Sequence, residues 1–507
     1  MAPLASPSAP PDFCQAKSVQ SPDRQRLAII ADAMILVLVA LVVRISTFGD
    51  PNVGGDEGFY QTVGIAMNAG AVPYVDIWDR KPWGLFFLYS LITSIESDPI
   101  GYQVAALIFA AATAFVISRI VLLWTDRQGA VLAGAAYLLF LVKFQGYGGQ
   151  APVFYNLFVV CAGALVLVAQ DDIRCGKAPL SSFAAMFLAG LAITCKQTAF
   201  AEAAFLGLTC AVTLVRAPVS EGLPANARWL TIALWALLGC LPFAAISAGY
   251  WLAGHGDIYW QAMVGANEAK PAVLAASLIR LVIMFASLAP LLVLGTLAVP
   301  STPPDRVRFV WLWLLAAIVG ITPARQFYLH YGLSLLPPAC LAASAFLSRR
   351  IFGLTALPLL AWYALADGHA WDFDHARRSK AAFARMAETI KAHKNDGPLF
   401  VFEGPSLLYP LTGSRPPTPL VFTAHLTQLT ERNVSHLDTL AEVRRILALD
   451  PTVIVLGPSP KQFPPNMETE RLVRDHVAQR CELIGRFARV EYWSDDEIDI
   501  WANCRRD

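Results

Sequence analysis

Two neighbouring polar stretches, residues 52–60 and 74–84, concentrate ionisable side chains in an otherwise apolar part of the sequence. Charges beside a membrane-spanning segment are costly unless they serve a site or lie in water. Carboxylates can accept a proton from a nucleophile, and cations can stabilise a departing anion. These stretches are therefore predicted to form a reactive centre at the membrane surface, and their charged residues are Asp56, Glu57, Asp76, Asp79, Arg80 and Lys81.

Asp56 and Glu57 follow a glycine pair and open a segment with helical spacing, residues 57–68. In a structural interpretation, Asp56 is the N-cap of this helix and the helix dipole favours Glu57. In a catalytic interpretation, Asp56 is a general base that takes a proton from an acceptor hydroxyl or amine. The two interpretations are compatible, because a capping residue is also held in a fixed position.

Arg80 and Lys81 directly precede Pro82, which suits the first position of a second amphipathic helix, residues 82–95. Basic groups at a helix N-terminus favour binding of a phosphate. The alternative is that these two residues anchor the chain at the membrane interface together with nearby tryptophans.

Other polar groups interrupt the apolar sequence further along. Lys196 is either a snorkelling lysine, with Glu202 as a candidate partner, or a cavity cation. Arg325 lies in an outer loop, against the expected charge bias, which suggests a phosphate ligand. His330 is either a structural histidine or an acid, base or metal ligand. The candidates for the cavity or the acceptor site are Tyr60, Asp79, Lys196, His330 and Tyr331, and His255, Asp257, Asn267, Glu268 and Lys270 are a candidate further wall.

The composition is that of a polytopic membrane protein. The 507 residues are 56% hydrophobic and 15% charged, whereas soluble domains average about 25% charged residues. The net charge of +1 gives no electrostatic basis for binding nucleic acid. No metal-ligand spacing is visible, so no metal site and no required cofactor are predicted, although a divalent cation beside Asp56 stays open.

Apolar runs predict about eleven transmembrane helices. They are expected at 27–46, 100–124, 129–146, 153–170, 181–195, 198–215, 229–253, 273–299, 309–323, 331–348 and 351–367. Residues 1–26 are predicted to be a disordered cytoplasmic N-terminus, 27–368 the membrane domain with a first outer loop at 47–99, and 369–507 a soluble extracytoplasmic domain.

Basic residues give an independent test of this topology, because they gather in cytoplasmic loops. If the N-terminus is cytoplasmic, every predicted cytoplasmic turn carries basic residues. An odd number of spans then places the tail on the outer side of the membrane, which we expect to be the bacterial inner membrane. The inner basic residues are Arg24, Arg26, Arg127, Arg174, Lys177, Arg216, Arg228, Arg306, Arg308, Arg349 and Arg350.

The tail alternates helical and strand patterns, which predicts a small α/β sheet. Helices are expected at 379–393 and 437–449, and strands at 399–402 and 452–456. Cys481 and Cys504 lie in this tail, and an oxidising compartment would allow them to pair.

Three sequence features together resemble the GT-C membrane glycosyltransferases. They are Asp-Glu in the first outer loop, then Tyr-x-Asp-x-Trp-Asp-x-Lys-Pro, and a late Arg-x-Phe-x-x-His-Tyr followed by Leu-Pro-Pro. The branch with the protein O-mannosyltransferases and the bacterial lipid A aminoarabinose transferases is the most similar, and residues 401–417 resemble the outer domain of bacterial members. Trp83 departs from the usual Lys-Pro-Pro of this family.

The resemblance implies that a sugar, hexosyl or pentosyl, is transferred from a polyprenyl-phosphate donor to a lipid, glycan or protein acceptor at the outer membrane face. It implies Asp56 as the catalytic acidic residue, and Lys81 and Arg325 at the donor phosphate. Glu57 and Arg80, which adjoin Asp56 and Lys81, are added as a catalytic and a phosphate-binding candidate. A transporter or flippase of lipid-linked sugars, a non-enzymatic membrane scaffold, and a phosphoglycosyl or ligase-type enzyme are the alternatives.

Overall fold

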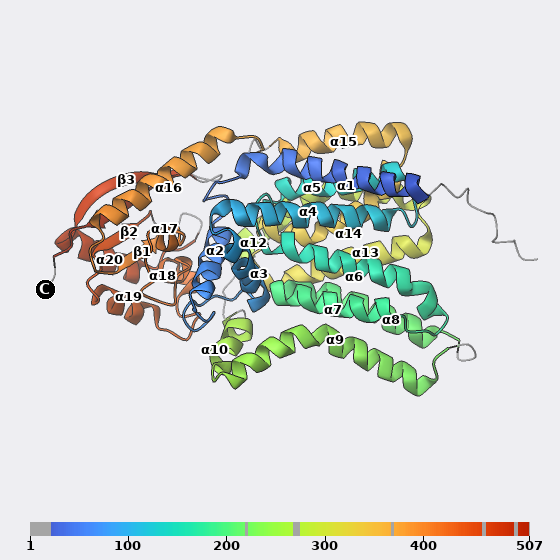
Figure 1. The fold of residues 1–507 in the computed structure, drawn as a ribbon, viewed down its shortest axis with the longest axis horizontal. Coiled ribbons are helices and arrows are strands. Elements are labelled where there is room, and N and C mark those ends of the chain that lie inside the picture. Colours follow the sequence, from blue (N-terminus) through green and yellow to red (C-terminus); the bar gives the residue numbers. More distant parts are fainter. Residues whose placement is uncertain are drawn as a thin grey trace, which may run out of the picture.

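The computed structural model describes residues 22–218, 222–266, 274–366, 370–458, 463–490 and 495–505. Figure 1 shows a bundle of long, roughly parallel helices and a smaller tail that contains a sheet. The short helices α2 (Gly55–Asn68), α3 (Trp83–Ile95) and α10 (Gly256–Trp260) lie between the bundle and the tail. The two predicted amphipathic segments of the first outer loop are therefore helices at the boundary between the two parts.

Each predicted span overlaps one long helix, so the polytopic helical fold is confirmed. Within the described residues, eight helices are long and apolar enough to cross a membrane. α1 begins at Pro22, before the predicted start at 27, while residues 1–21 lie outside the described part. The bundle helices are α1 (Pro22–Arg44), α4 (Pro99–Val121), α5 (Arg127–Lys143), α6 (Ala151–Arg174), α7 (Leu180–Cys195), α8 (Phe200–Arg216), α9 (Ala225–Leu252), α12 (Leu274–Ala298), α13 (Pro304–Ile321), α14 (Leu336–Leu347) and α15 (Arg350–Leu365).

Small residues bring the outer-loop helices against each other and against the bundle. A Cβ atom at Gly64 would lie 2.7 Å from the carbonyl carbon of Tyr89, so α2 and α3 touch where α2 has no side chain. A Cβ atom at Gly84 would lie 2.4 Å from Thr194 Oγ1, which fixes α3 against the end of α7 in the same way. Close backbone contact at small residues is a common way for membrane helices to pack.

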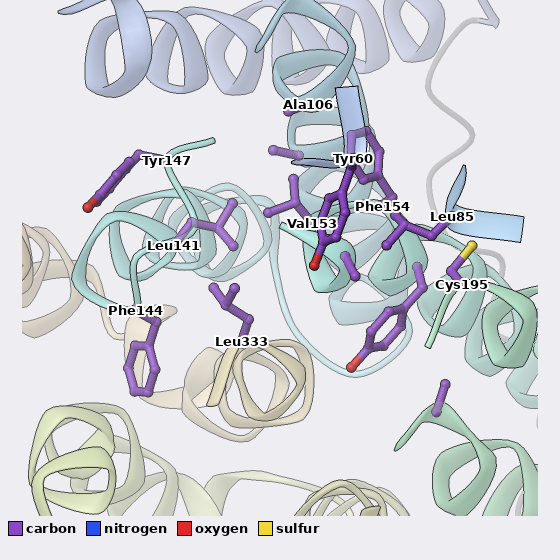
Figure 2. Packing of buried hydrophobic residues seen from close by; sticks show 14 of the residues in the cluster. Tyr60, Leu85, Ala106, Leu141, Phe144, Tyr147, Val153, Phe154, Cys195 and Leu333 are labelled. Carbon is purple, nitrogen blue, oxygen red and sulfur yellow. The ribbon is translucent and has the colours of Figure 1, made fainter. Parts of the chain in front are cut away.

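Aromatic and aliphatic side chains fill the end of the bundle nearest these helices. Tyr60 of α2, Leu85 of α3 and Phe154 of α6 are buried members of one hydrophobic cluster, part of which Figure 2 shows. The Tyr60 ring lies edge-on to Phe86 and to Tyr89. This packing holds the first turn of α2, which carries Asp56, on a rigid base.

The tail is a four-stranded mixed sheet with helices, so the predicted α/β domain is confirmed. The strand order is β1-β2-β4-β3, with β1 parallel to β2 and the other pairs antiparallel. Both predicted strands and both predicted helices are present, whereas α20 and the β3–β4 hairpin were not predicted. The elements are α16 (Phe373–His393), β1 (Leu399–Glu403), α17 (Leu408–Leu411), α18 (Ala424–Thr427), α19 (Thr439–Leu447), β2 (Val453–Leu456), α20 (Met467–Arg480), β3 (Glu482–Val490) and β4 (Asp495–Ala502).

Cys481 and Cys504 form a disulfide that joins the start of β3 to the chain after β4. Closing a loop of this size stabilises a domain by about 2–4 kcal/mol, mainly through the unfolded state. We expect Cys481→Ser to destabilise the tail by that amount, seen as faster hydrogen exchange of β3 and β4. Cys175→Ser, at an exposed free cysteine of the bundle, is the control. Unchanged exchange of the hairpin in Cys481→Ser would contradict a stabilising role.

Candidate active site

A cavity of about 760 Å³ lies between the bundle and the tail. Its walls come from the first outer loop, from the 145–150 loop, from the turn between α7 and α8, from residues 319–331, and from the tail. Nine of the ten predicted site residues line the cavity, and the tenth, Tyr60, is buried next to it. Asp56, Glu57, Asp79, Arg80, Lys81, Lys196, Arg325, His330 and Tyr331 line it.

Asp56 and Lys81 form an ion pair in this cavity. Lys81 Nζ lies 3.6 Å from Asp56 Oδ2, and these side chains keep 26% and 20% of their surface exposed, so both are open to a substrate. The same ammonium group lies 5.0 Å from the centre of the Tyr60 ring, an arrangement that favours a cation. A single small molecule bound in the cavity could therefore contact both this carboxylate and this cation.

Asp56 lies in the first turn of α2, whose N-cap is Gly54. The prediction that Asp56 is the N-cap is therefore wrong, because the helix starts earlier than the sequence pattern suggested. Burial raises the pKa of the Asp56 carboxyl, but the nearby basic groups, with Lys81 first among them, together outweigh burial, and the net pKa lies below its ordinary value. Asp56 is consequently a carboxylate at neutral pH and able to accept a proton.

Glu57 differs from its neighbour in both exposure and charge. It is 1% exposed and accepts a hydrogen bond of 3.1 Å from Gln150 Nε2. A Cβ atom at Gly148 would lie 2.7 Å from Glu57 Oε1, so the loop passes directly over this carboxyl. Burial and the neighbouring Asp56 charge raise the pKa of Glu57 to about 8. Glu57 is therefore mostly neutral at pH 7 and joins α2 to the 145–150 loop.

Asp79 fixes the turn that presents Lys81. Its Oδ1 accepts a 2.8 Å hydrogen bond from the Lys81 backbone N–H, and Tyr74 Oη donates a 2.9 Å hydrogen bond to the Lys81 carbonyl. Burial raises the pKa of Asp79, but Lys81 and a hydrogen bond to His425 outweigh this and bring the pKa to about 2. Asp79 is thus a permanent, buried anion that holds the Lys81 backbone.

Arg80 points away from Lys81 and toward the tail. Its guanidinium donates to Glu431 Oε1 at 3.0 Å and lies 2.9 Å from Glu431 Oε2, and Glu431 is 3% exposed. Arg80 was predicted as a donor-phosphate ligand, but the structure engages it in an ion pair between the outer loop and the tail.

Lys196 also lines the cavity, 4.5 Å from the centre of the Tyr331 ring. Burial and the positive charge of Lys81 lower the pKa of Lys196 to about 7. Its expected partner Glu202 instead accepts a 2.8 Å hydrogen bond from Trp313 Nε1, so that pairing was wrong. Lys196 is therefore a second cavity cation whose charge depends on pH near neutrality.

His330 and Arg325 complete the wall that the 319–331 segment provides. The His330 ring stacks on Tyr328 and meets Tyr331 edge-on, with centroids 5.7 and 4.8 Å apart. Arg325 is exposed and has a left-handed backbone, with φ of 54°. An aromatic cluster thus holds His330 in place, while the Arg325 side chain is available to an incoming anion.

The remaining predicted wall is described only in part. His255 and Asp257 are not among the cavity-lining residues, whereas Met263 of the adjoining segment is. Asn267, Glu268 and Lys270 lie outside the described residues. Among the residues that the structure describes, no three or more His, Cys, Asp or Glu side chains are grouped so that they could hold a metal ion.

Gln150, His425 and Glu431 are among the cavity residues and their supports that were not predicted. Gln150 lies in a short glycine-rich outer loop, and its position before a helix was its only signal. His425 and Glu431 belong to the tail, more than 300 residues from the stretch that they contact. Such contacts depend on how the tail docks, which local sequence patterns do not encode.

The bundle, the outer-loop helices and the tail together have the GT-C fold that the sequence features predicted. The crystal structure of ArnT from Cupriavidus metallidurans bound to undecaprenyl phosphate matches with a TM-score of 0.60 and 14% identity, over 95% of this chain and 98% of that one. The apo form of the same protein matches with a TM-score of 0.55, also at 14% identity, over 96% and 98% of the two chains.

An oligosaccharyltransferase from Archaeoglobus fulgidus matches with a TM-score of 0.49 and 11% identity, over 86% of this chain and 70% of that one. No family model and no curated protein sequence matches the chain. At these identities, the similarity to ArnT establishes the shared fold.

Proposed function

We propose that this protein is a glycosyltransferase that moves a sugar from a polyprenyl-phosphate carrier to an acceptor, with inversion at the sugar C1. The observation that carries the proposal is the Asp56–Lys81 pair, 3.6 Å apart in a cavity at one end of a membrane bundle. A carboxylate and a cation so close together suit an acceptor proton and a leaving phosphate. The similar ArnT structure was determined with undecaprenyl phosphate bound, which supports a lipid carrier.

The proposed reaction is a direct displacement. The acceptor oxygen or nitrogen attacks C1, its proton passes to Asp56, and the bond from C1 to the phosphate oxygen breaks. The electron pair of that bond stays on the polyprenyl phosphate, which Lys81 stabilises with Lys196 and Arg325 nearby. Since phosphate is a fair leaving group, positioning and charge neutralisation account for much of the rate. In this scheme the prenyl chain packs against the apolar helices of the bundle.

The sugar is a hexosyl or pentosyl group, and the acceptor a lipid, glycan or protein. The scheme assigns no step to a metal. A divalent cation beside Asp56 is the alternative, and turnover measured with and without a chelator tests for it.

The function is tested by reconstituting the full chain in vesicles with a panel of radiolabelled polyprenyl-phosphate sugars. A glycosyltransferase removes label from the carrier and places it on an acceptor or on water. The same preparation of Asp56→Asn is the control for contaminating activity. Movement of intact labelled lipid between leaflets without loss of label would instead show a transporter or flippase. If neither transfer nor movement is seen, the scaffold alternative is favoured.

We further propose that the N-terminus is cytoplasmic and that the tail and cavity face the outside of a bacterial inner membrane. Basic residues gather at the inner turns, and the Cys481–Cys504 disulfide suits an oxidising compartment. In intact cells, we expect a membrane-impermeant thiol reagent to label Glu388→Cys, on the exposed face of α16, but not the natural exposed Cys175. Labelling of Cys175 alone would show that the topology is the opposite of the proposed one.

The charge of Lys196 predicts a pH dependence of donor binding. Because burial and Lys81 lower its pKa to about 7, Lys196 loses its positive charge as the pH rises from 6 to 8. We expect KM for the donor to rise over this range by up to about tenfold, the change in the protonated fraction. Lys196→Arg, which stays charged, should show a flatter profile. Equal slopes in both proteins would exclude Lys196 from donor binding.

A further inference from the structure

Two buried polar residues of the tail, His425 and Glu431, lie against the turn that presents Lys81. His425 follows Ala424 in α18 and is 1% exposed, and Glu431 is 3% exposed. Figure 1 places α18 in the part of the tail that faces α2 and the bundle. Ionisable groups are rarely buried unless they are paired, so their partners indicate what they do.

These partners are the neighbours of Lys81 in the sequence. His425 Nε2 lies 3.5 Å from Asp79 Oδ2, and its Nδ1 lies 3.5 Å from Glu431 Oε2. Glu431 in turn holds the guanidinium of Arg80 through both of its carboxylate oxygens. The imidazole therefore bridges two carboxylates, and the residue on each side of the Asp79–Arg80 peptide is held from the tail.

The other end of Asp79 reaches the reacting groups. Asp79 Oδ1 accepts the Lys81 N–H at 2.8 Å, and Lys81 Nζ faces Asp56 at 3.6 Å. A continuous series of contacts thus runs from Glu431 and His425 through Asp79 to the cation at the cavity. Gln197 of the bundle adds a further hydrogen bond of 3.2 Å to the Arg80 carbonyl.

The tail does not need this series of contacts in order to dock. Trp78 N–H donates to the Pro419 carbonyl at 2.8 Å, and Asn52 Nδ2 donates to the Val490 carbonyl at 2.8 Å. Ser379 Oγ donates to Asp50 Oδ1 at 2.6 Å, and the Phe59 and Phe422 rings lie 5.2 Å apart. Since these contacts lie outside the His425–Glu431 pair, docking alone does not explain why two ionisable groups are buried there.

We propose that His425 and Glu431 are positioning residues of the transfer site, which hold the Asp79–Arg80 turn so that the Lys81 ammonium faces Asp56 and the donor phosphate. The tail is then a structural part of the active site. The kinetic side of this inference rests on the proposed glycosyl transfer. A displacement of about 1 Å in a positioned group can lower a rate about a hundredfold, so small shifts of this turn have large effects.

The test compares His425→Gln and Glu431→Gln with Glu468→Gln in the full chain in lipid nanodiscs. Glu468 pairs with Arg432 at 3.0 Å on the tail surface, so the control also removes a tail ion pair. We expect the first two variants to lose about tenfold or more in kcat/KM for the donor, and the control to match wild type. If His425 acts through Asp79, His425→Gln combined with Asp79→Asn loses no more than the worse single variant.

Hydrogen exchange separates positioning from docking and from the reaction itself. We expect His425→Gln to speed exchange of the amides of residues 76–81 and to leave β1 and β2 unchanged. Wild-type kinetics and wild-type exchange in both variants would overturn the proposal, and faster exchange throughout the tail would reduce the pair to a docking contact. If wild type transfers no sugar, the proposed function fails, but the exchange experiment still decides whether the tail holds this turn.

Discussion

Replacing Asp56 by Asn is expected to lower turnover about 10²-fold or more, the usual contribution of a general base. The amide has nearly the same shape as the carboxylate, and the site at the first turn of α2 is 20% exposed, so the fold should persist. The amide has no basic oxygen at neutral pH, whereas the pKa of Asp56 lies below its ordinary value because Lys81 and the other nearby basic groups together outweigh the effect of burial. Single-turnover transfer from labelled donor measures the loss directly.

The matched control is Asp76→Asn in the same outer loop. Asp76 is exposed, and its Oδ2 accepts a local hydrogen bond from the Val72 N–H at 2.7 Å. Asp76→Asn should therefore retain wild-type turnover. Turnover near wild type in Asp56→Asn would end the assignment of Asp56 as the base and would point to Glu57 or to a substrate group.

The pH profile gives a second check on the base. A carboxyl with a lowered pKa stays deprotonated to lower pH than an ordinary carboxyl, so the rate should hold to lower pH than it would with an ordinary aspartate as the base. Glu57 behaves in the opposite way, since burial and Asp56 raise its pKa to about 8. Any change in rate between pH 7 and 9 that Glu57→Gln removes therefore belongs to Glu57 and not to the base.

Local patterns predicted the parts of the site that lie close together in the sequence. Asp56 and Lys81 are separated by one amphipathic helix and one turn, and their charges stand out against apolar surroundings. The helix boundaries were also readable, because long apolar runs and basic inner turns mark membrane spans. The N-cap of α2 could not be predicted exactly, because both Gly54 and Asp56 suit the start of a helix.

Long-range pairs explain what the sequence did not predict. Arg80 carries the charge of a phosphate ligand, and only the docked tail shows that Glu431 holds it. Likewise, His425 stands alone in the tail sequence and acquires a partner in Asp79 only through the fold. The β3–β4 hairpin was missed because its strands carry many charged residues, although its register also sets the Cys481–Cys504 bond.

The second large effect is expected for Lys81→Met. Methionine keeps the length and packing of the side chain but removes the ammonium that faces Asp56 and the cavity. Removing one group that stabilises developing negative charge usually costs about 10²–10³-fold in kcat. The loss should appear in kcat more than in KM, because the charge on the phosphate grows as the bond to the sugar breaks.

Lys81→Arg and Lys391→Met separate the possible causes of such a loss. Arginine keeps the charge, so it should recover part of the activity, whereas Lys391→Met removes an exposed lysine of the tail and should have no effect. If Lys81 were only an interfacial anchor, Lys81→Met would lower membrane insertion or stability and leave kcat of the inserted protein unchanged. That outcome would leave the departing phosphate to Lys196 and Arg325, and it would remove the observation on which the proposed function rests.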